Sequence, residues 1–353
     1  MKKVMKIIGM MCMGALLVLG ASSCKKDKTE KFSSFDIGLP AIEGESGIDD
    51  DSKAYIDLLT GEMKWYDGDN VMMYSLAPDY TQSQAYVFYG DENITGATQA
   101  HFTGFYLPEH EEGGFFAFYP ASKASSEIQH DNRVAFNVDS IQTWETDFYV
   151  SNPSYVGRVF MDPRCVVGAA TSDIIDNHAV FNLEHIFGYL NIRIMDASNS
   201  GKYVKSVTIT DKNLHLTGSM SVKILALNNT DLLAMKGYGI TYRDNPSMAA
   251  ETYWGNITEK LQKFGYKGNG TGYSVTLDCS AANGGNGVPI ISKKKYFLMS
   301  LRPGALMNGF TITLKFGDNS TKSYEVGPNH QYITIPGTYT VISIDLAQTK
   351  GGL

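Results

Sequence analysis

Cysteine is scarce in this chain, which contains only four among its 353 residues. Cys12 lies in an apolar stretch near the start and Cys24 follows that stretch, so Cys165 and Cys279 are left in separate halves. Two cysteines so far apart do not make a disulfide framework. The sequence has no C-x-x-C pair and no cluster of cysteine and histidine, which argues against a structural zinc site. We expect no metal and no cofactor.

Positive charge is also in short supply. The chain has 30 lysines and arginines against 37 aspartates and glutamates, a formal net charge of −7. Removing the first 23 residues removes three lysines and brings this charge to −10. An acidic chain lacks the basic surface that nucleic acids require, so no nucleic-acid partner is expected. Beyond those residues there is no apolar run long enough to span a membrane.

Catalytic motifs are missing as well. The sequence contains no G-x-S-x-G, H-E-x-x-H, P-loop or dinucleotide-binding glycine pattern. The acidic run at residues 49–51 lacks the alternating oxygen ligands of a calcium loop, and we interpret it as a solvated loop. A glycoside hydrolase would need two carboxylates about 5–10 Å apart in a cleft, and no spacing selects such a pair. We therefore expect a protein that is not an enzyme.

What the N-terminus does contain is a signal for export. Three lysines among the first six residues precede the apolar run Ile7–Leu19, which is too short to span a bilayer. The Ala-Ser-Ser that precedes Cys24 resembles a bacterial lipobox, although Ala21 replaces the usual leucine-like residue. We expect residues 1–23 to be a lipoprotein signal peptide and Cys24 to carry lipid, with residues 25–31 as a tether. The alternative is a plain signal peptide with an incidental cysteine.

The rest of the chain is typical of an all-β protein. It has 35 glycines and 21 tyrosines, with short alternating runs between turn residues. The clearest run is Phe310–Phe316, whose apolar residues alternate on one strand face. A turn at Gly317–Ser320 and a return at Lys322–Val326 predict a hairpin. Val204–Thr210 and Tyr273–Leu277 show the same alternation.

Two β-sandwich domains fit this length and spacing. The small, polar stretch at residues 167–178 marks the best boundary, so we expect domains at 54–176 and 177–353. Within them, His185 is interpreted as a hydrogen-bonded core or edge residue rather than a ligand. Trp65 is expected in a core, whereas a core and a sugar-stacking role stay open for Trp144 and Trp254.

Several motifs then resemble those of the fimbrillin family of Bacteroidetes, in the family's order. They include a W-x-x-G-D strand and turn, two strands ending in Phe-Tyr-Pro, an Asp-Leu-Met-like segment, a strand with F-x-x-H and a pair of closing strands. In the same order they are Met63–Ser75, Ala100–Ser122, Thr146–Pro153, Ala179–Ile194 and Ile333–Leu346. The resemblance implies two tandem transthyretin-like β-sandwich domains and a fimbrial subunit or surface adhesin. Asp27 also resembles the surface-export signal of lipoproteins from this group, which implies the outer membrane and cell surface.

The resemblance further implies assembly by strand exchange. In the family, a protease removes the first strand, and a neighbour's C-terminal strand fills the groove. Here Lys31–Pro40 is the expected first strand, with apolar residues at 32, 35 and 37, and Lys53-Ala54 ends a loop suited to cleavage. The best-known members are cut after arginine, but the first arginine here is Arg133. Either the protease accepts lysine, or the strand is retained on a lipid-anchored subunit; Lys53 is then an ordinary exposed lysine.

The expected donor strand lies at residues 338–346. Tyr339 and Val341 would lie on one face and Ile342, Ile344 and Leu346 on the other. Glycine at position 337 would act as a hinge. The alternative is an interior strand of the protein's own second domain.

The expected partners are other fimbrial subunits, in a homo- or hetero-polymer, the outer membrane through the lipid, and a host or bacterial surface ligand. Stalk, tip and anchor roles all stay open. The rival hypothesis is a surface glycan-binding lipoprotein of a nutrient uptake system. A solvent-facing row of tryptophan or tyrosine would favour that rival, and a groove filled by a removable strand would favour fimbriae.

Overall fold

The computed structural model consists almost entirely of β-strands. It describes residues 31–39, 41, 63–75, 84–108, 115–129, 133–144, 168–171, 173–175, 178–223, 267–268, 272–328 and 330–348. The helical elements among these residues are the single turns η1 (Ala121–Lys123) and α5 (Ala282–Gly285). No helix in this part of the chain is long and apolar enough to cross a bilayer. The all-β class predicted from the sequence is confirmed.

The N-terminal half is built from two sheets. A nine-stranded sheet has the order β10-β11-β1-β4-β3-β2-β5-β9-β12, and a four-stranded sheet has the order β16-β15-β7-β6. The bounds of the first sheet, in chain order, are Lys31–Gly38, Asn70–Ser75, Gln84–Gly90, Gln99–Pro108, Phe115–Tyr119, Gly168–Thr171, Asp173–Ile175, His178–Asn182 and Glu184–His185 (β1 to β5, β9 to β12). Those of the second are Ala124–Gln129 (β6), Arg133–Val138 (β7), Gly218–Lys223 (β15) and Lys267–Gly268 (β16).

The C-terminal half is a second sandwich. A three-stranded sheet, β19-β13-β22, faces the sheet β21-β20-β14-β17-β8, with β18 paired to β14. The bounds are Ile141–Thr143 (β8), Gly188–Met195 (β13), Tyr203–Asp211 (β14), Ser274–Asp278 (β17), Val288–Pro289 (β18), Lys295–Leu301 (β19), Phe310–Phe316 (β20), Thr321–Val326 (β21) and Tyr339–Asp345 (β22). The predicted hairpin is confirmed as β20 and β21, which pair antiparallel. It could be predicted because alternation and a turn are local features of the sequence.

Three clusters of buried apolar side chains hold these sheets together. In β2 and β5 every residue but the first of β2 is buried, so both faces of these strands are covered. Val71 and Met73 enter a first core, whereas Met72 and Tyr74 enter a second core shared with the four-stranded sheet. The third core lies between the two sheets of the C-terminal half.

Strand pairing crosses the predicted boundary at residue 177 in both directions. The stretch at 179–194 forms β11, β12 and β13 rather than one strand; β11 pairs with β1, whereas β13 joins the C-terminal half. The break falls at Ile186 and Phe187, whose buried side chains contribute to the second core. Strand β8 crosses the other way to pair with β17. Pairing does not test independent folding, so the two-domain boundaries stay a prediction.

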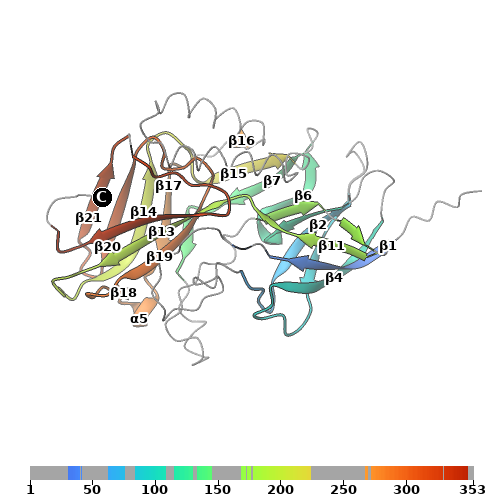
Figure 1. Ribbon diagram of the computed structural model, residues 1–353, viewed down its shortest axis with the longest axis horizontal. Helices are drawn as coiled ribbons and strands as arrows, with labels where there is room; N and C mark the ends of the chain where they lie inside the picture. Colours follow the sequence, from blue (N-terminus) through green and yellow to red (C-terminus); the bar gives the residue numbers. More distant parts are fainter. Residues whose placement is uncertain are drawn as a thin grey trace, which may run out of the picture.

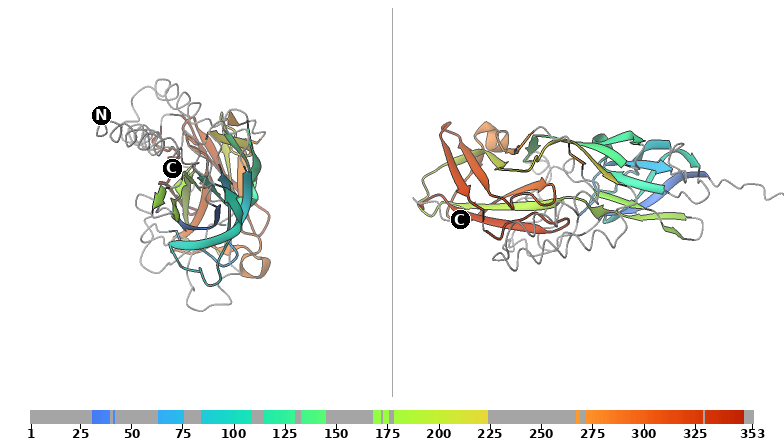
Figure 2. Two further views of the ribbon diagram at one scale, coloured as in Figure 1. Left: turned by 90° about the vertical axis from the view of Figure 1, so that its right-hand side faces the viewer. Right: turned by 90° about the horizontal axis from the view of Figure 1, so that it is seen from above.

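The molecule is elongated, with its two terminal strands extending toward opposite ends (Figure 1). Strand β1, drawn in blue, begins at the end of the N-terminal half. The C-terminal strands, drawn in red, lie at the other end, and the view from above agrees (Figure 2). Both β1 and β22 run roughly along the long axis, which places the start of one and the end of the other far apart.

Candidate functional site

Strand β1 is inserted between two strands that are remote from it in the sequence. It pairs antiparallel with β4, with Ile37 opposite Ala100, and parallel with β11, with Ile37 beside Phe181. Its neighbours therefore bond both edges of its C-terminal part. Because β1 is the first of the described strands, a single cut in the segment between β1 and β2 would sever its covalent link to the strands that follow it.

The inward side chains of β1 fill the first core. Phe35 and Ile37 are fully buried. The ring of Phe35 contacts Phe88, Phe115 and Phe181 edge to face, with ring centroids 5.2, 5.2 and 5.4 Å away. Phe115 belongs to β5, three strands beyond β4 in sheet order, so the sheet curves around this core. Without β1 the curved sheet would enclose an apolar groove.

Trp65 fastens the strand from inside the fold. Its indole N–H donates to the backbone oxygen of Ile37 at 2.9 Å. Its ring packs edge to face on Phe102 and Tyr119, with centroids 4.7 and 5.1 Å away, and it is fully buried. The prediction of Trp65 as a core residue is confirmed, and its one polar side-chain atom bonds the backbone of β1.

Asp69 supports the turn that carries Trp65. Its carboxylate accepts hydrogen bonds from the Tyr66 backbone N–H at 2.9 Å and the Tyr119 hydroxyl at 3.0 Å. Burial raises the pKa of Asp69 from 3.8 to about 6, against the lowering effect of these two bonds, and Asp67 raises it further. The carboxylate bonded to Tyr119, a neighbour of Trp65, therefore has a pKa well above its ordinary value.

The outward face of β1 is polar. Asp36 and His101 of β4 pair at 2.8 Å, with about a third of each side chain exposed. A Cβ on Gly38 would lie 2.9 Å from the side-chain oxygen of Asn182, so glycine allows close approach to β11. Of the predicted strand Lys31–Pro40, residues Lys31–Gly38 form β1, with Phe35 and Ile37 buried as expected, and Pro40 lies outside the described residues. The side chain of Phe32 is not among those described.

Three predicted processing residues lie outside the described residues. These are Cys24, Lys53 and Ala54, and the acidic run 49–51 and Trp254 are outside as well. The lipid attachment and the cleavage site thus stay predictions.

The C-terminal strand β22 is paired with a strand of its own subunit. It pairs in parallel with β13 and, among the described strands, has no other sheet partner. Ile342 and Ile344 are buried in the third core, and Leu346 packs against it half-buried. Tyr339 belongs to the first core, with Val341 packed against it. The two predicted faces are therefore confirmed as faces, whereas the donor role stays a prediction.

The segment before β22 is a tight turn. Gly337 has a positive φ of 65°, and its N–H donates to the Phe187 oxygen at 2.9 Å. A Cβ there would lie 3.1 Å from the ring of His185. The hydroxyl of Thr340 donates to the Ile333 oxygen at 2.6 Å. These contacts fix the start of β22 to its own subunit.

Three other residues singled out in the sequence, His185, Trp144 and Cys279, are buried or partly buried. His185 is buried, with Nδ1 2.6 Å from the Tyr189 hydroxyl, as expected for a core histidine. Trp144 is partly buried against the third core. Cys279 is buried as a free thiol whose pKa is raised by burial, so it is a poor nucleophile. In the described residues no three His, Cys, Asp or Glu side chains gather as a metal site.

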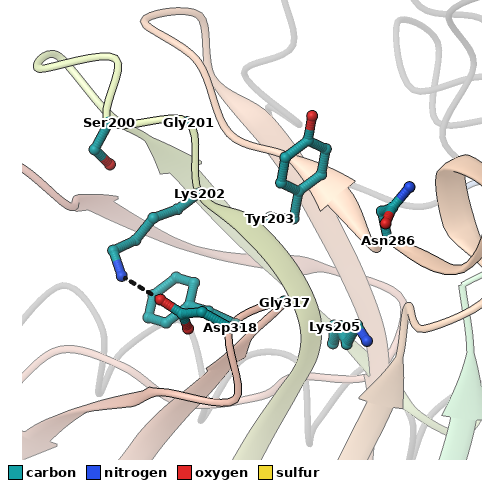
Figure 3. Close-up of a pocket in the computed structure, with 9 residues that line it drawn as sticks. Ser200, Gly201, Lys202, Tyr203, Lys205, Asn286, Gly317 and Asp318 are labelled. Carbon is teal, nitrogen blue, oxygen red and sulfur yellow. Dashed lines mark hydrogen bonds and ion pairs between the residues drawn. The ribbon is translucent and has the colours of Figure 1, made fainter.

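A polar pocket of about 340 Å³ lies in the C-terminal half, where the β13–β14 loop meets the β20–β21 turn (Figure 3). Lys202 pairs with Asp318 at 3.3 Å and lies over the Phe316 ring, 4.6 Å from its centroid. Hydrogen bonds from Ser320 lower the pKa of Asp318 to about 2. Among the described residues that line this pocket, Asp318 is the one carboxylate, so a two-carboxylate glycosidase site is not formed here.

Two features escaped prediction from the sequence. The parallel pairing of β1 with β11 joins distant segments through backbone atoms and leaves no local pattern. A group of exposed aromatic side chains on β3 and β4 was also missed: Tyr86, Tyr89, Phe105 and Tyr106. A glycine inside the β4 pattern, Gly104, was a usable signal, because glycine in a strand often marks a bulge.

Comparison with known proteins gives a match at the level of structure alone. No protein-family model matches the chain, and no curated protein does. Solved structures similar to it include adhesion and fimbrial proteins from Bacteroidetes. A cell adhesion protein from Bacteroides uniformis is 13% identical at a TM-score of 0.42, with 89% of this chain and 94% of that chain covered. One from Bacteroides ovatus is 8% identical at a TM-score of 0.44, with 89% of this chain and 93% of that chain covered.

A tip fimbrial protein from Porphyromonas gingivalis, truncated at its C-terminus, is 6% identical at a TM-score of 0.33, with 90% and 96% covered. At such identities and TM-scores these neighbours carry no functional inference, and the function proposed below is based on the geometry of the strands.

Proposed function

We propose that this protein is a structural or adhesive subunit of cell-surface fimbriae, exported as a lipoprotein through Cys24. It assembles with other fimbrial subunits by donor-strand exchange after proteolytic removal of its first strand. Its role is mechanical and adhesive rather than enzymatic, and it is located at the outer membrane and cell surface or in the fimbrium.

The observation that carries this proposal is the position of β1. The first of the described strands lies between β4 and β11 with its apolar side chains in the first core, and the segment that joins it to β2 contains Lys53-Ala54. Cleavage there leaves two strand edges with unpaired backbone groups beside an uncovered core. Such an edge pairs readily with another strand.

Strand β22 offers a matching pattern. Phe35-Asp36-Ile37 places two buried apolar side chains around a half-exposed polar one, and Ile342-Ser343-Ile344 repeats this order. A neighbour's β22 would therefore put Ile342 and Ile344 where Phe35 and Ile37 had been. Because the two terminal strands extend toward opposite ends of the molecule, each subunit would join the next head to tail, and such contacts grow filaments.

A cysteine crosslink tests this exchange. Ala100 lies opposite Ile37, so Ala100→Cys and Ile344→Cys come within disulfide range if a donor strand enters in this register. We expect intermolecular ladders from the double variant of the cleaved protein on a non-reducing gel. The matched control replaces Ala100→Cys by Ala85→Cys, on β3 of the same sheet but outside the groove.

Absence of ladders, together with unfolding of the C-terminal half when residues 338–353 are deleted, would assign β22 to its own subunit. The protein would then be a tip, an anchor or a stand-alone adhesin. Lipid attachment is tested separately, since Cys24→Ala is expected to abolish labelling by a fatty-acid analogue and retention in the membrane. Unchanged labelling of that variant would refute lipidation.

A second candidate function is glycan binding by a surface lipoprotein of a nutrient uptake system. The observation that favours it is the exposed aromatic pair Tyr86 and Phe105, whose ring centroids lie 5.6 Å apart. Exposed rings can stack on sugars. Affinity electrophoresis in polysaccharide gels, with Tyr86→Ala and Phe105→Ala, would show retardation that both variants lose.

A further inference from the structure

The most exposed large apolar side chains of the described residues lie at one place on β4. Phe105 is 74% exposed and Tyr106 is 67% exposed, and Tyr86 of β3, at 39%, packs its ring against Phe105. We call Tyr86, Phe105 and Tyr106 the end patch. Large exposed apolar groups in one place usually mark a contact surface.

A bulge in β4 creates this exposure. The register between β1 and β4 shifts so that residues 104–106 of β4 all lie opposite Ser33 alone. Ladder pairing between β3 and β4 is limited to Tyr89 and Gly90, so the hydrogen-bonded ladder is interrupted beyond that point. Gly104 makes room for the Phe88 ring, since a Cβ there would lie 2.8 Å from it. Phe88 therefore stays in the core, whereas Phe105 and Tyr106, which follow Gly104, face outward.

The end patch lies where β1 begins. Lys31 pairs with Pro108 and Phe32 with Leu107, the residues that directly follow the patch. Only seven peptide steps separate Lys31 from Cys24. At about 3.5 Å per residue, these span at most about 25 Å. A lipid on Cys24 would therefore keep this end of the molecule near the bilayer surface.

The composition of the patch suits that position. Residues 84–89 and 103–107 contain no charged side chain in an otherwise acidic protein. Tyrosine has an apolar ring with a polar tip, and aromatic residues collect at the membrane–water interface. Charge at this end is mixed, because Glu109, Glu111 and Glu112 follow the patch in the sequence whereas residues 25–31 hold four lysines against Asp27 and Glu30. We propose that the end patch rests in the interfacial layer of the bilayer that holds Cys24, through contact of its aromatic rings.

This proposal depends on the proposed lipidation, applies to the chain before cleavage at Lys53-Ala54, and predicts a different occupant of the patch from the glycan of the second candidate function. Rings that stack on a polysaccharide must stay open to a long polymer, whereas the short tether holds this end against the membrane. The two rings of the pair are tilted by 49° and do not form one flat platform. Position and tilt together favour lipid over glycan as the occupant.

Fluorescence quenching in vesicles tests the contact without relying on cellular lipidation. The chain from residue 24 onward carries an N-terminal histidine tag and is anchored to phosphatidylcholine vesicles containing a nickel-chelating lipid. Phe105→Trp supplies a probe within the patch, and brominated phosphatidylcholine supplies the quencher. The control is Ile291→Trp, at a position 41% exposed in the C-terminal half. We expect at least a twofold loss of the added emission for Phe105→Trp and less than a tenth for Ile291→Trp.

Three results would overturn the proposal. No quenching of Phe105→Trp would show that the patch stays out of the lipid, whatever the fate of Cys24 in cells. Equal quenching of both variants would show general adsorption. Protection of Phe105→Trp from aqueous iodide by a soluble polysaccharide, but not by vesicles, would assign the patch to sugars. Quenching together with failed labelling of Cys24 in cells would support the patch and refute the proposed lipidation.

Discussion

The first and last of the described strands are held in different ways. Strand β1 has a partner on each side, β4 and β11, whereas β22 pairs with β13 alone among the described strands. Both bury apolar residues two apart: Phe35 and Ile37 in β1, and Ile342 and Ile344 in β22. Loss of β1 would open a slot with two bonding edges. Loss of β22 would expose one strand edge, on β13, and would uncover parts of the third core and of the first core.

This difference assigns complementary properties to the two ends. A slot between two strands selects its occupant by backbone bonds on both sides and by side-chain shape inside. An edge strand is easier to release, since only one ladder must open. The first position is therefore suited to accept a strand and the last is suited to donate one.

Removal of β1 should have the largest effect. A chain that begins at Ala54 loses the burial of Phe35 and Ile37, worth roughly 3–6 kcal/mol together, in addition to two ladders. We expect lower stability in urea and self-association in size-exclusion chromatography. A synthetic peptide of residues 31–40 should restore stability.

The same experiment sharpens the comparison at the other end. A peptide of residues 338–346 should bind a chain truncated before residue 338. Its affinity should be at least tenfold lower than that of the 31–40 peptide for the chain that begins at Ala54, because it forms one strand ladder and not two. A monomeric chain from Ala54 that is as stable as the longer one would contradict the groove.

Substitution of Phe35 should come next. Phe35→Ala removes a ring that contacts three others and should lower the free energy of unfolding by about 3–5 kcal/mol. Ile344→Ala on β22 should cost about 2–5 kcal/mol. Phe105→Ala, at an exposed site of the same sheet, is the control and should change stability by less than about 0.5 kcal/mol. Equal values for Phe35→Ala and the control would mean that β1 does not support the core.

Acidity should stabilise the N-terminal end selectively. The folded-state pKa of Asp69, about 6, lies above its unfolded value of 3.8, so its contribution to stability is present below pH 4 and lost as pH rises through 6. Its size is at most about 3 kcal/mol. Asp69→Asn should flatten the rise in stability between pH 7 and pH 4 in urea unfolding. An unchanged pH profile in that variant would assign the dependence to other groups.

The smallest effects should come from single hydrogen bonds that fasten each strand. Trp65→Phe keeps an aromatic ring but removes the bond to Ile37, at a cost of about 1–2 kcal/mol. Thr340→Val removes the corresponding bond on β22, at about 1 kcal/mol. Hydrogen exchange should report faster opening of β1 in the first variant and of β22 in the second. Uniform acceleration throughout the chain would show global destabilisation instead.

Local patterns allowed part of this structure to be predicted. The hairpin β20–β21 could be predicted because alternation and a turn lie within one short segment. The core position of Trp65 could be predicted because burial of a large apolar ring is favourable. The pairing of β1 with β11 was not readable, since parallel ladders use backbone groups that every sequence carries. The raised pKa of Asp69 was not predictable either: the sequence shows its turn, but its burial arises from segments that are remote in the sequence and that fold around it.

The orientation of the terminal strands has a mechanical consequence. Both β1 and β22 run roughly along the long axis of the molecule. Tension on a filament joined through these strands would pull along the strand direction, so all hydrogen bonds of both ladders would bear load together rather than break one after another. Forced separation is governed by the barrier to opening and not by equilibrium affinity. Such a joint would withstand flow and shear even if its equilibrium affinity were modest.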